Sequence, residues 1–147
     1  MLYYGDEIAM PGGPDPDNRR DCPGGWLGDP RNAFEAAGRT AEEQKLFSHL
    51  QRLPQWRAAS DALRHGRMVD LLADDQAYAF ARVTATSQIV VAFNHARQPA
   101  TLTIPVGGAG IVDGVTLQDG YGTAPAATAR GGAIEVQMAP GSVAIYR

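Results

Sequence analysis

This sequence is poor in the features that mark several large classes of protein. Its one cysteine, Cys22, excludes an internal disulfide and a zinc site made of cysteines. It has no run of about twenty apolar residues, which a membrane-spanning helix requires. Its formal net charge of −3 gives no reason to expect a nucleic acid or a membrane surface as a partner. With 147 residues, of which 44% are hydrophobic, the chain is predicted to fold as one domain or as a domain plus a fragment.

The N-terminal part of the sequence has little regular periodicity. The apolar run from Met1 to Tyr4 predicts a short strand. The segment that follows, up to residue 38, is crowded with glycine and proline and forbids a regular helix through most of its length. Long loops of this kind are usually functional or disordered. Because the chain opens without a cap or polar residues, we expect its native N-terminus to lie upstream, so the lack of a signal peptide leaves cytoplasm, periplasm and secretion all open.

A helix is predicted over residues 40–65. Thr40 and Glu43 have the spacing of a capping box, in which each side chain bonds the backbone N–H of the other residue. Pro54 is expected to kink or split the helix because it lacks an N–H and crowds the preceding turn. The predicted apolar stripe consists of Leu46, Phe47, Leu50 and Leu53.

The sequence after residue 66 has the texture of β structure. Alanine alternates with Tyr78, Phe80 and Arg82, which is the period of a strand with two unlike faces. Short strands separated by Gly, Asp and Pro predict an antiparallel sandwich of the Greek-key type. The expected strands are residues 77–82, 88–94, 100–106, 115–118, 133–138 and 142–146. Residues 122–132 are expected to form a flexible loop.

The strongest functional pattern is the run Asp15-Pro16-Asp17-Asn18-Arg19. Taken alone, such a run is a turn. Its setting is more specific, because residues 3–8 (YYGDEI) followed by residues 12–19 (GGPDPDNR) resemble the alpha-amylase superfamily of glycoside hydrolases (family 13), nearest in pattern to its neopullulanase- and cyclomaltodextrinase-like members. The resemblance implies that Asp15 and Arg19 hydrogen-bond a sugar next to the scissile bond. A carboxylate can accept hydrogen bonds from neighbouring sugar hydroxyls, and a guanidinium can donate to them. The alternative is that Asp15 and Arg19 form an ion pair that only stiffens the loop.

The same resemblance implies a fold for the whole chain. Residues 50–66 are similar to the last helix of the family's catalytic barrel, and residues 74–82 and 90–94 look like the opening strands of its C-terminal domain. The implied fold is mainly β. Residues 66–147 would form a C-terminal antiparallel β-sandwich domain, and residues 1–65 a strand-loop-helix remnant of the (β/α)8 barrel.

Two more residues are candidates for substrate binding. Trp26 could stack on a sugar ring, or could pack beneath the loop. Glu7 would lie beside the site, where the family's last barrel strand ends, or could be a structural acid satisfied by backbone donors. On the C-terminal domain, Tyr121 and Tyr146 are the candidates for an exposed aromatic residue at a surface sugar site.

The resemblance also indicates what the sequence lacks. Retaining glycoside hydrolysis needs two carboxyl groups about 5–5.5 Å apart across the scissile bond. The family's nucleophile, acid/base and third acid come from earlier barrel strands, and their motifs do not occur in this sequence. We therefore expect no catalytic residue and an inactive isolated chain. The histidines have no metal-ligand spacing, so we expect neither a metal nor a cofactor.

Three interpretations follow from the sequence. In the first, the chain is the C-terminal portion of an alpha-amylase-family glycosidase whose partner, in the full-length enzyme, is an alpha-glucan oligosaccharide. In the second, it is a standalone carbohydrate-binding or interaction β-sandwich; in the third, it is a stability domain without a ligand. Unpaired strand edges and apolar surface favour association, so we also expect dimerisation through residues 1–60, or disorder of residues 1–38.

Overall fold

The computed structural model describes residues 2–147 and divides the chain into two compact units, Met1–Trp56 and Arg57–Arg147. The division falls inside helix α1 (Ala41–Ala59), upstream of the boundary expected between residues 65 and 66. No helix within residues 2–147 has the length and apolar character needed to cross a membrane.

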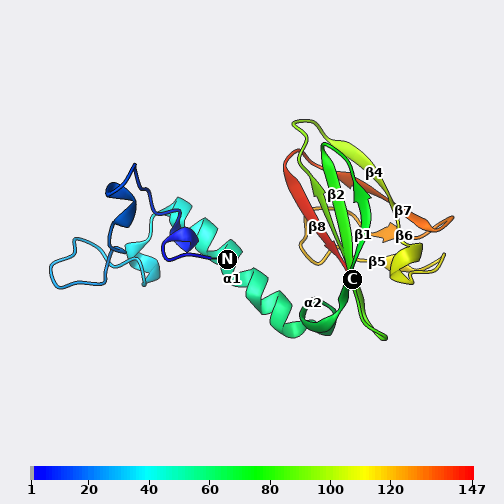
Figure 1. Ribbon diagram of the computed structural model, residues 1–147, viewed down its shortest axis with the longest axis horizontal. Coiled ribbons are helices and arrows are strands. Elements are labelled where there is room, and N and C mark those ends of the chain that lie inside the picture. The colour runs from blue at the N-terminus through cyan, green and yellow to red at the C-terminus, as the bar shows by residue number, and fades with distance from the viewer. Residues whose placement is uncertain (1) are drawn as a thin grey trace. The chain divides into compact units, whose positions relative to one another are not determined.

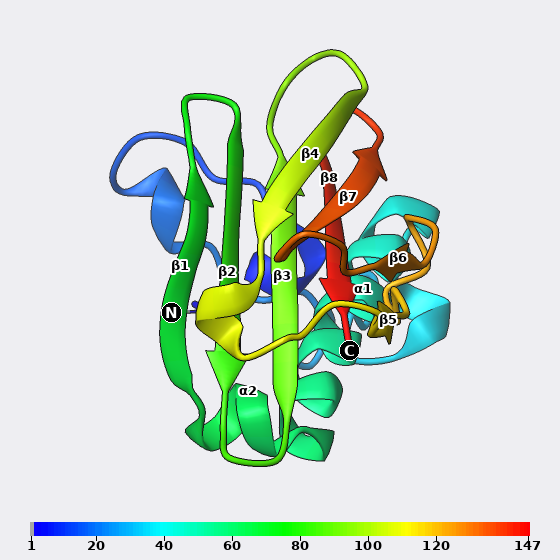
Figure 2. The same cartoon turned by 90° about the vertical axis from the view of Figure 1, so that its right-hand side faces the viewer.

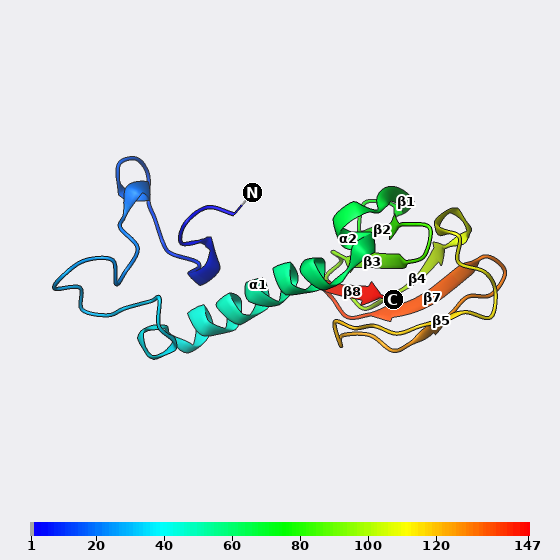
Figure 3. The ribbon, with the colours of Figure 1, turned by 90° about the horizontal axis from the view of Figure 1, so that it is seen from below.

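The second unit is a two-layer sandwich of antiparallel strands (Figures 1 and 3). Its strands are β1 (Arg67–Ala73), β2 (Ala77–Val83), β3 (Gln88–Asn94), β4 (Ala100–Pro105), β5 (Thr116–Leu117), β6 (Ala127–Thr128), β7 (Ala133–Met138) and β8 (Ser142–Tyr146). One layer is a four-stranded sheet in the order β1-β2-β3-β8, and the other holds the pairs β4–β7 and β5–β6. The prediction of a mainly β fold with antiparallel sheets is confirmed.

The chain crosses between the layers twice along its main strands. From β3 it passes to β4 in the other layer, and from β7 it returns to β8, which pairs with β3 (Figure 2). A short 3₁₀ turn, η4 (Gly107–Ala109), follows β4. Strands β3, β7 and β8 begin and end at the residues predicted for them from the sequence.

The core lies between the two layers, and strand β2 contributes small side chains to it. From β2 it receives the buried Ala77, Ala79 and Ala81, and the partly buried Val83 packs against it. The facing strands β4 and β7 supply Leu102, Ile104, Ile134, Val136 and Met138. Small side chains on β2 leave room for branched and long ones elsewhere in the core, which is how a close-packed interior is filled.

Tyr146 belongs to this core, and its predicted role as an exposed aromatic residue is wrong. The residue is fully buried, and its hydroxyl donates to the Pro125 carbonyl at 2.9 Å. Burial raises the pKa of the Tyr146 hydroxyl to about 12. Tyr121, the other aromatic candidate, is half-buried.

Two strands escaped the sequence analysis. In β1 a register shift between Asp70 and Leu72 interrupts the alternation that would have identified it. Strand β6 lies inside residues 122–132, which were expected to be a flexible loop. Ala127 and Ala129 of that segment are buried in the core, so the expectation of a flexible loop is wrong for this part.

The helical region begins as predicted but breaks elsewhere. Thr40 N donates to Glu43 Oε2 at 2.8 Å, and Glu43 N donates to Thr40 Oγ1 at 3.2 Å, which confirms the capping box. Helix α1 continues through Pro54, and the expected break there is wrong. The break falls at Ser60, because its side chain accepts from Leu63 N and so caps the next helix, α2 (Asp61–His65).

The first unit contains α1 up to Trp56 and a long loop with three 3₁₀ turns, η1 (Asp6–Ile8), η2 (Asp17–Arg19) and η3 (Ala36–Gly38). Met1 lies outside the described residues, and residues 2–4, expected to be a strand, do not form one. A strand needs a neighbour to take its backbone hydrogen bonds. Here the Tyr3 N–H donates instead to Asp6 Oδ2 at 2.7 Å.

Asn94, at the end of β3, is a buried polar residue that joins two turns of the sandwich. Its Nδ2 donates to the carbonyls of Gln98 at 3.1 Å and Ala139 at 2.9 Å. Its Oδ1 accepts from Ala96 N at 3.0 Å. One side chain therefore satisfies buried backbone groups from both the β3–β4 and the β7–β8 connections.

Replacing Asn94 by the nearly isosteric leucine should destabilise the chain by about 3 kcal/mol. The reason is that each buried backbone group left without a partner costs roughly 1–3 kcal/mol. The measurement is urea unfolding followed by far-UV circular dichroism at pH 7. Gln98→Ala is the control, because the bond at residue 98 uses only its backbone carbonyl. Equal stability of Asn94→Leu and the parent chain would contradict the assignment.

Candidate functional site

The candidate site lies on the loop of the first unit and starts from a tight glycine turn. Gly5 has a φ of 87°, and its carbonyl accepts from Ile8 N and Met10 N at 3.2 and 2.9 Å. A Cβ atom at this position would approach Cβ of Met10 to 2.8 Å, so the turn requires glycine. Ile8 is buried and anchors the turn within the unit.

The loop brings Asp15 and Arg19 side by side. Turn η2 forms because Arg19 N donates to the Pro16 carbonyl at 3.1 Å. Arg19 Nη2 then donates to Asp15 Oδ1 at 2.6 Å. The two side chains are 72% and 62% exposed, so the second carboxylate oxygen and the other guanidinium N–H groups stay open to a ligand's hydroxyls.

A second ion pair is interlaced with the first and is closed on itself. Arg20 holds Asp17 with two bonds, Nε to Oδ1 at 2.6 Å and Nη2 to Oδ2 at 2.5 Å. The hydrogen bond from Arg20 lowers the pKa of the Asp17 carboxyl and raises the pKa of the guanidinium. Both carboxylate oxygens of Asp17 are thus already engaged, whereas Asp15 has one to offer.

Trp26 lies on the surface, not beneath the loop. Trp26 is 68% exposed to solvent. The Asp29 carboxylate fixes the surrounding backbone, because its Oδ2 accepts from Gly24 N at 2.7 Å and from Trp26 N at 3.1 Å. The indole is therefore presented on an ordered turn, as a stacking platform requires.

Glu7 is half-buried in η1 and lies near the single cysteine. Burial raises the pKa of the Cys22 thiol, and the negative charge of Glu7 adds to that effect. Within residues 2–147 no hydrogen bond or ion pair joins Glu7 or Trp26 to the Asp15–Arg19 pair. The structure thus pairs two of the four predicted binding residues, Asp15 and Arg19, directly with each other.

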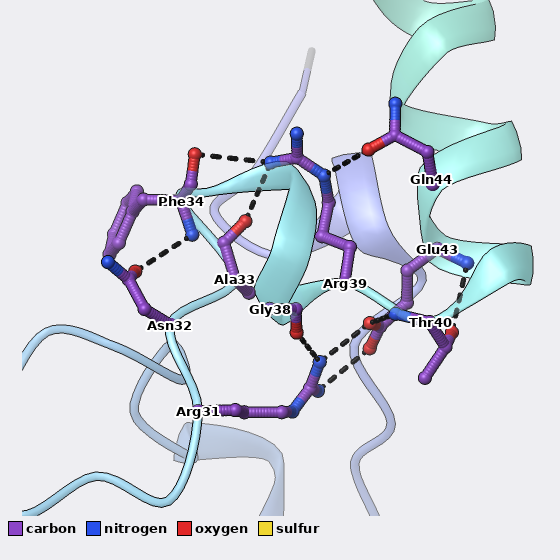
Figure 4. Close-up of polar contacts among 9 residues, drawn as sticks. All are labelled: Arg31, Asn32, Ala33, Phe34, Gly38, Arg39, Thr40, Glu43 and Gln44. Atoms are coloured by element: carbon purple, nitrogen blue, oxygen red, sulfur yellow. Dashed lines mark hydrogen bonds and ion pairs between the residues drawn. The ribbon is translucent and has the colours of Figure 1, made fainter.

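Sequence analysis missed the residues that fasten this loop to α1 (Figure 4). Arg31 forms a two-point ion pair with Glu43, Nη1 to Oε2 at 2.6 Å and Nη2 to Oε1 at 2.8 Å. Its Nη1 also donates to the Gly38 carbonyl at 3.0 Å. The hydrogen bond from Arg31 is the main reason that the pKa of Glu43 falls to about 2.

Arg39 fastens the same loop from a second direction (Figure 4). Its Nη1 donates to the Ala33 carbonyl, and its Nε donates to Gln44 Oε1, both at 2.7 Å. Its guanidinium carbon lies 3.9 Å from the centre of the Phe47 ring, a cation–π contact. We call Arg31, Arg39 and Glu43 the loop clamp. Only its capping-box part has a sequence signal, since no spacing rule relates Arg31 to Glu43.

The exposed polar groups of the loop can form hydrogen bonds with hydroxyl groups. Asp15 and Arg19 offer one carboxylate oxygen and the remaining guanidinium N–H groups, and Trp26 separately offers an indole face. Within residues 2–147 no group of three or more His, Cys, Asp or Glu side chains is arranged to hold a metal ion.

Comparison with protein families shows which family the second unit belongs to. Residues 68–147, more than half of the chain, match the family model described as the neopullulanase-like C-terminal domain. The chain belongs to this family. The resemblance to the alpha-amylase superfamily and its neopullulanase- and cyclomaltodextrinase-like members is thereby confirmed.

Individual relatives of this neopullulanase-like chain agree. It is 29% identical over 107 residues to a cyclomaltodextrinase from Geobacillus thermopakistaniensis. It superposes on the Nostoc punctiforme debranching enzyme with a TM-score of 0.69 at 28% identity over 99% of its length. An Anoxybacillus alpha-amylase, at 23% identity over 98% of the chain and a TM-score of 0.73, shows the same fold. The chain therefore carries the C-terminal domain found in alpha-amylase-family glycosidases.

These relatives are much longer than this chain. The matched region spans 71% of the present chain but 16% of the cyclomaltodextrinase. The corresponding share is 27% for both the Nostoc debranching enzyme and the Anoxybacillus alpha-amylase.

The stability that the loop clamp contributes is expected to depend on pH. Glu43 has a pKa of about 2 in the folded chain against an ordinary 4.5, so its contribution to stability is complete above pH 4.5 and is lost as pH falls towards 2. Glu43→Gln should lower the urea midpoint at pH 7, and its difference from the parent should shrink between pH 4.5 and 2. Tryptophan fluorescence follows the unfolding. Glu42→Gln makes the same charge change one residue away; an equal effect of both variants would rule out the clamp.

Proposed function

We propose that this chain is the C-terminal portion of an alpha-amylase-family glycosidase that acts on alpha-linked glucose oligosaccharides. In this proposal residues 1–65 are the end of the catalytic barrel, and residues 66–147 are the C-terminal domain. The chain carries a substrate-binding loop, and the catalytic carboxylates lie upstream. The domain match and the short share of each relative's length support this placement.

The observation that carries the proposal is the open Asp15–Arg19 pair. A single bond at 2.6 Å orients two exposed charged groups and leaves hydrogen-bonding positions on each of them. Such a pair can accept from one hydroxyl of a pyranose and donate to its neighbour, which binds the ring without touching the anomeric carbon. Trp26 would add a stacking surface and Glu7 a further acceptor. That the Nostoc debranching enzyme has also been solved after soaking with acarbose supports the ligand class.

A second candidate function is a standalone carbohydrate-binding or structural β-sandwich module. It is favoured by one observation, the separate hydrophobic core of the second unit. A module of this kind would bind maltooligosaccharides without any barrel, whereas a piece of a glycosidase would bind them only within the whole enzyme. We further propose that the chain on its own either dimerises through residues 1–60 or loses order in residues 1–38, because Tyr3 and Phe34 are exposed apolar residues in this stretch.

The size of the native product is the first test. An antibody raised against this chain should detect, in the source cells, a band several times larger than 15.6 kDa. The larger product should turn over maltooligosaccharides, and the 147-residue chain should not. A band at 15.6 kDa, or turnover by the purified short chain, would contradict the proposal.

Within the larger product, Asp15→Asn should reduce kcat/KM for maltooligosaccharides by about tenfold or more. A hydrogen bond to a charged group is worth roughly 1.5–3 kcal/mol, and each 1.4 kcal/mol is a factor of ten. Asp17→Asn is the matched control, since it removes an exposed carboxylate from the same loop but one already closed by Arg20. Equal losses from the two variants would mean that both pairs only stiffen the loop.

A further inference from the structure

A groove opens between β6 and β7, which follow one another along the chain but belong to different sheets. At the turn that joins them, Arg130 N donates to the Ala133 carbonyl at 2.8 Å, and Ala133 N donates to the Arg130 carbonyl at 3.2 Å. Beyond this bridge, within residues 2–147, β6 pairs only with β5 and β7 only with β4. The two strands therefore separate and leave a groove of about 480 Å³ between them. A space of this size falls in the range of small-ligand sites, roughly 300–1,000 Å³.

The alternation of side chains along the two strands decides what lines the groove. Ala127 and Ala129 on the β6 side are buried in the core, as is Ile134 of β7, so their neighbours in the chain turn the other way. Thr103 joins them from β4, because it lies opposite Glu135 in the β4–β7 register. The lining residues include Thr103, Ala126, Thr128, Arg130, Ala133 and Glu135.

Two charged side chains of this lining are free to bind a ligand. Arg130 and Glu135 are both exposed, and neither side chain has a hydrogen bond or an ion pair among residues 2–147. The turn beside them is ordered, because the Asp113 carboxylate accepts from Gly131 N and from Gly132 N, both at 2.8 Å. Asp113 is thus occupied with the backbone, whereas Glu135 and Arg130 offer acceptors and donors on a fixed frame.

The lining suits a neutral ligand that carries many hydroxyl groups. An anion would be attracted by Arg130 but repelled by Glu135, and a cation would meet the reverse. A hydroxyl both donates and accepts, so neighbouring hydroxyls of one sugar can use the carboxylate and the guanidinium together. Between these charges, Ala126 and Ala133 offer methyl groups to the C–H faces of a sugar ring. Because no aromatic side chain lines the groove, binding of a single sugar there should be weak.

We propose that the groove between β6 and β7 is a second sugar-binding site, which holds a distant stretch of an alpha-glucan chain while another stretch occupies the substrate site of the larger enzyme. The inference rests on the proposed function, which supplies the ligand. A weak site contributes little to a short oligosaccharide. It contributes much more to a long chain that is already held at one point, because the second contact then forms at a high effective concentration.

Substrate length tests this proposal. In the larger gene product, Arg130→Ala/Glu135→Ala removes both free charges from the groove without changing the net charge. We expect it to raise the ratio of KM for amylose to KM for maltotriose by about tenfold, since only the long chain gains from a second contact. Thr101→Ala/Gln137→Ala is the matched control, because it truncates the neighbouring cross-strand pair on β4 and β7, outside this groove. The control should change the ratio by less than about twofold.

The other outcomes separate this proposal from the proposed function. An unchanged ratio in a product that still turns over maltotriose would overturn the groove alone, as would turnover of maltotriose without turnover of amylose. An equal rise in both KM values would show that the two residues act on the substrate site and not on a second one. The absence of any larger product would remove the proposed function as well. If urea unfolding shows that the double variant is not folded, Arg130→Ala and Glu135→Ala, measured singly, decide the question.

Discussion

The need of every backbone N–H and C=O for a hydrogen-bonding partner is the constraint on which both units of this chain depend. In the second unit strand pairing meets it over most of the length, and side chains meet it at the turns. The Asp119 carboxylate accepts from the N–H groups of Tyr121, Thr123, Ala124 and Ile145. These backbone bonds keep the pKa of Asp119 low despite its burial. Asn94 likewise bonds backbone carbonyls of the β3–β4 and β7–β8 connections.

In the first unit side chains bond many of the backbone N–H and C=O groups of the loop, because the loop has no strand partner. Asp29 holds the turn around Trp26, and Arg31 and Arg39 hold the carbonyls of Gly38 and Ala33. The substrate-binding residues proposed here thus stand on a loop whose order comes from charged groups. That order is sensitive to pH in a way that a sheet would not be, since one carboxylate, Glu43, both caps α1 and binds Arg31.

The features that could be predicted from the sequence are those that depend on local patterns or on a known motif. The alternation in β2, the bounds of β3, β7 and β8, and the capping box are all local, and the structure confirms them. The predictions that failed depended on contacts with other parts of the chain, which local patterns do not show. A bulge hid β1, Ser60 rather than Pro54 ended α1, and Tyr146 found its place in a core that only the packed layers create. At the site, Asp15 and Arg19 stood out by motif, but Arg31 did not, because its partner is fixed by the path of the loop and not by spacing.

The run of alanines in β2 has a consequence for redesign of the sandwich. A strand whose buried side chains are single methyl groups lets the opposing layer approach closely at that strand, so Ala79 and Ala81 set the spacing there. Nothing can be trimmed from such a strand, and any larger residue would have to push the layers apart. Strands β4 and β7 supply isoleucines, a valine and a methionine that can be shortened or exchanged against one another, so the spacing opposite β2 can be adjusted from these strands.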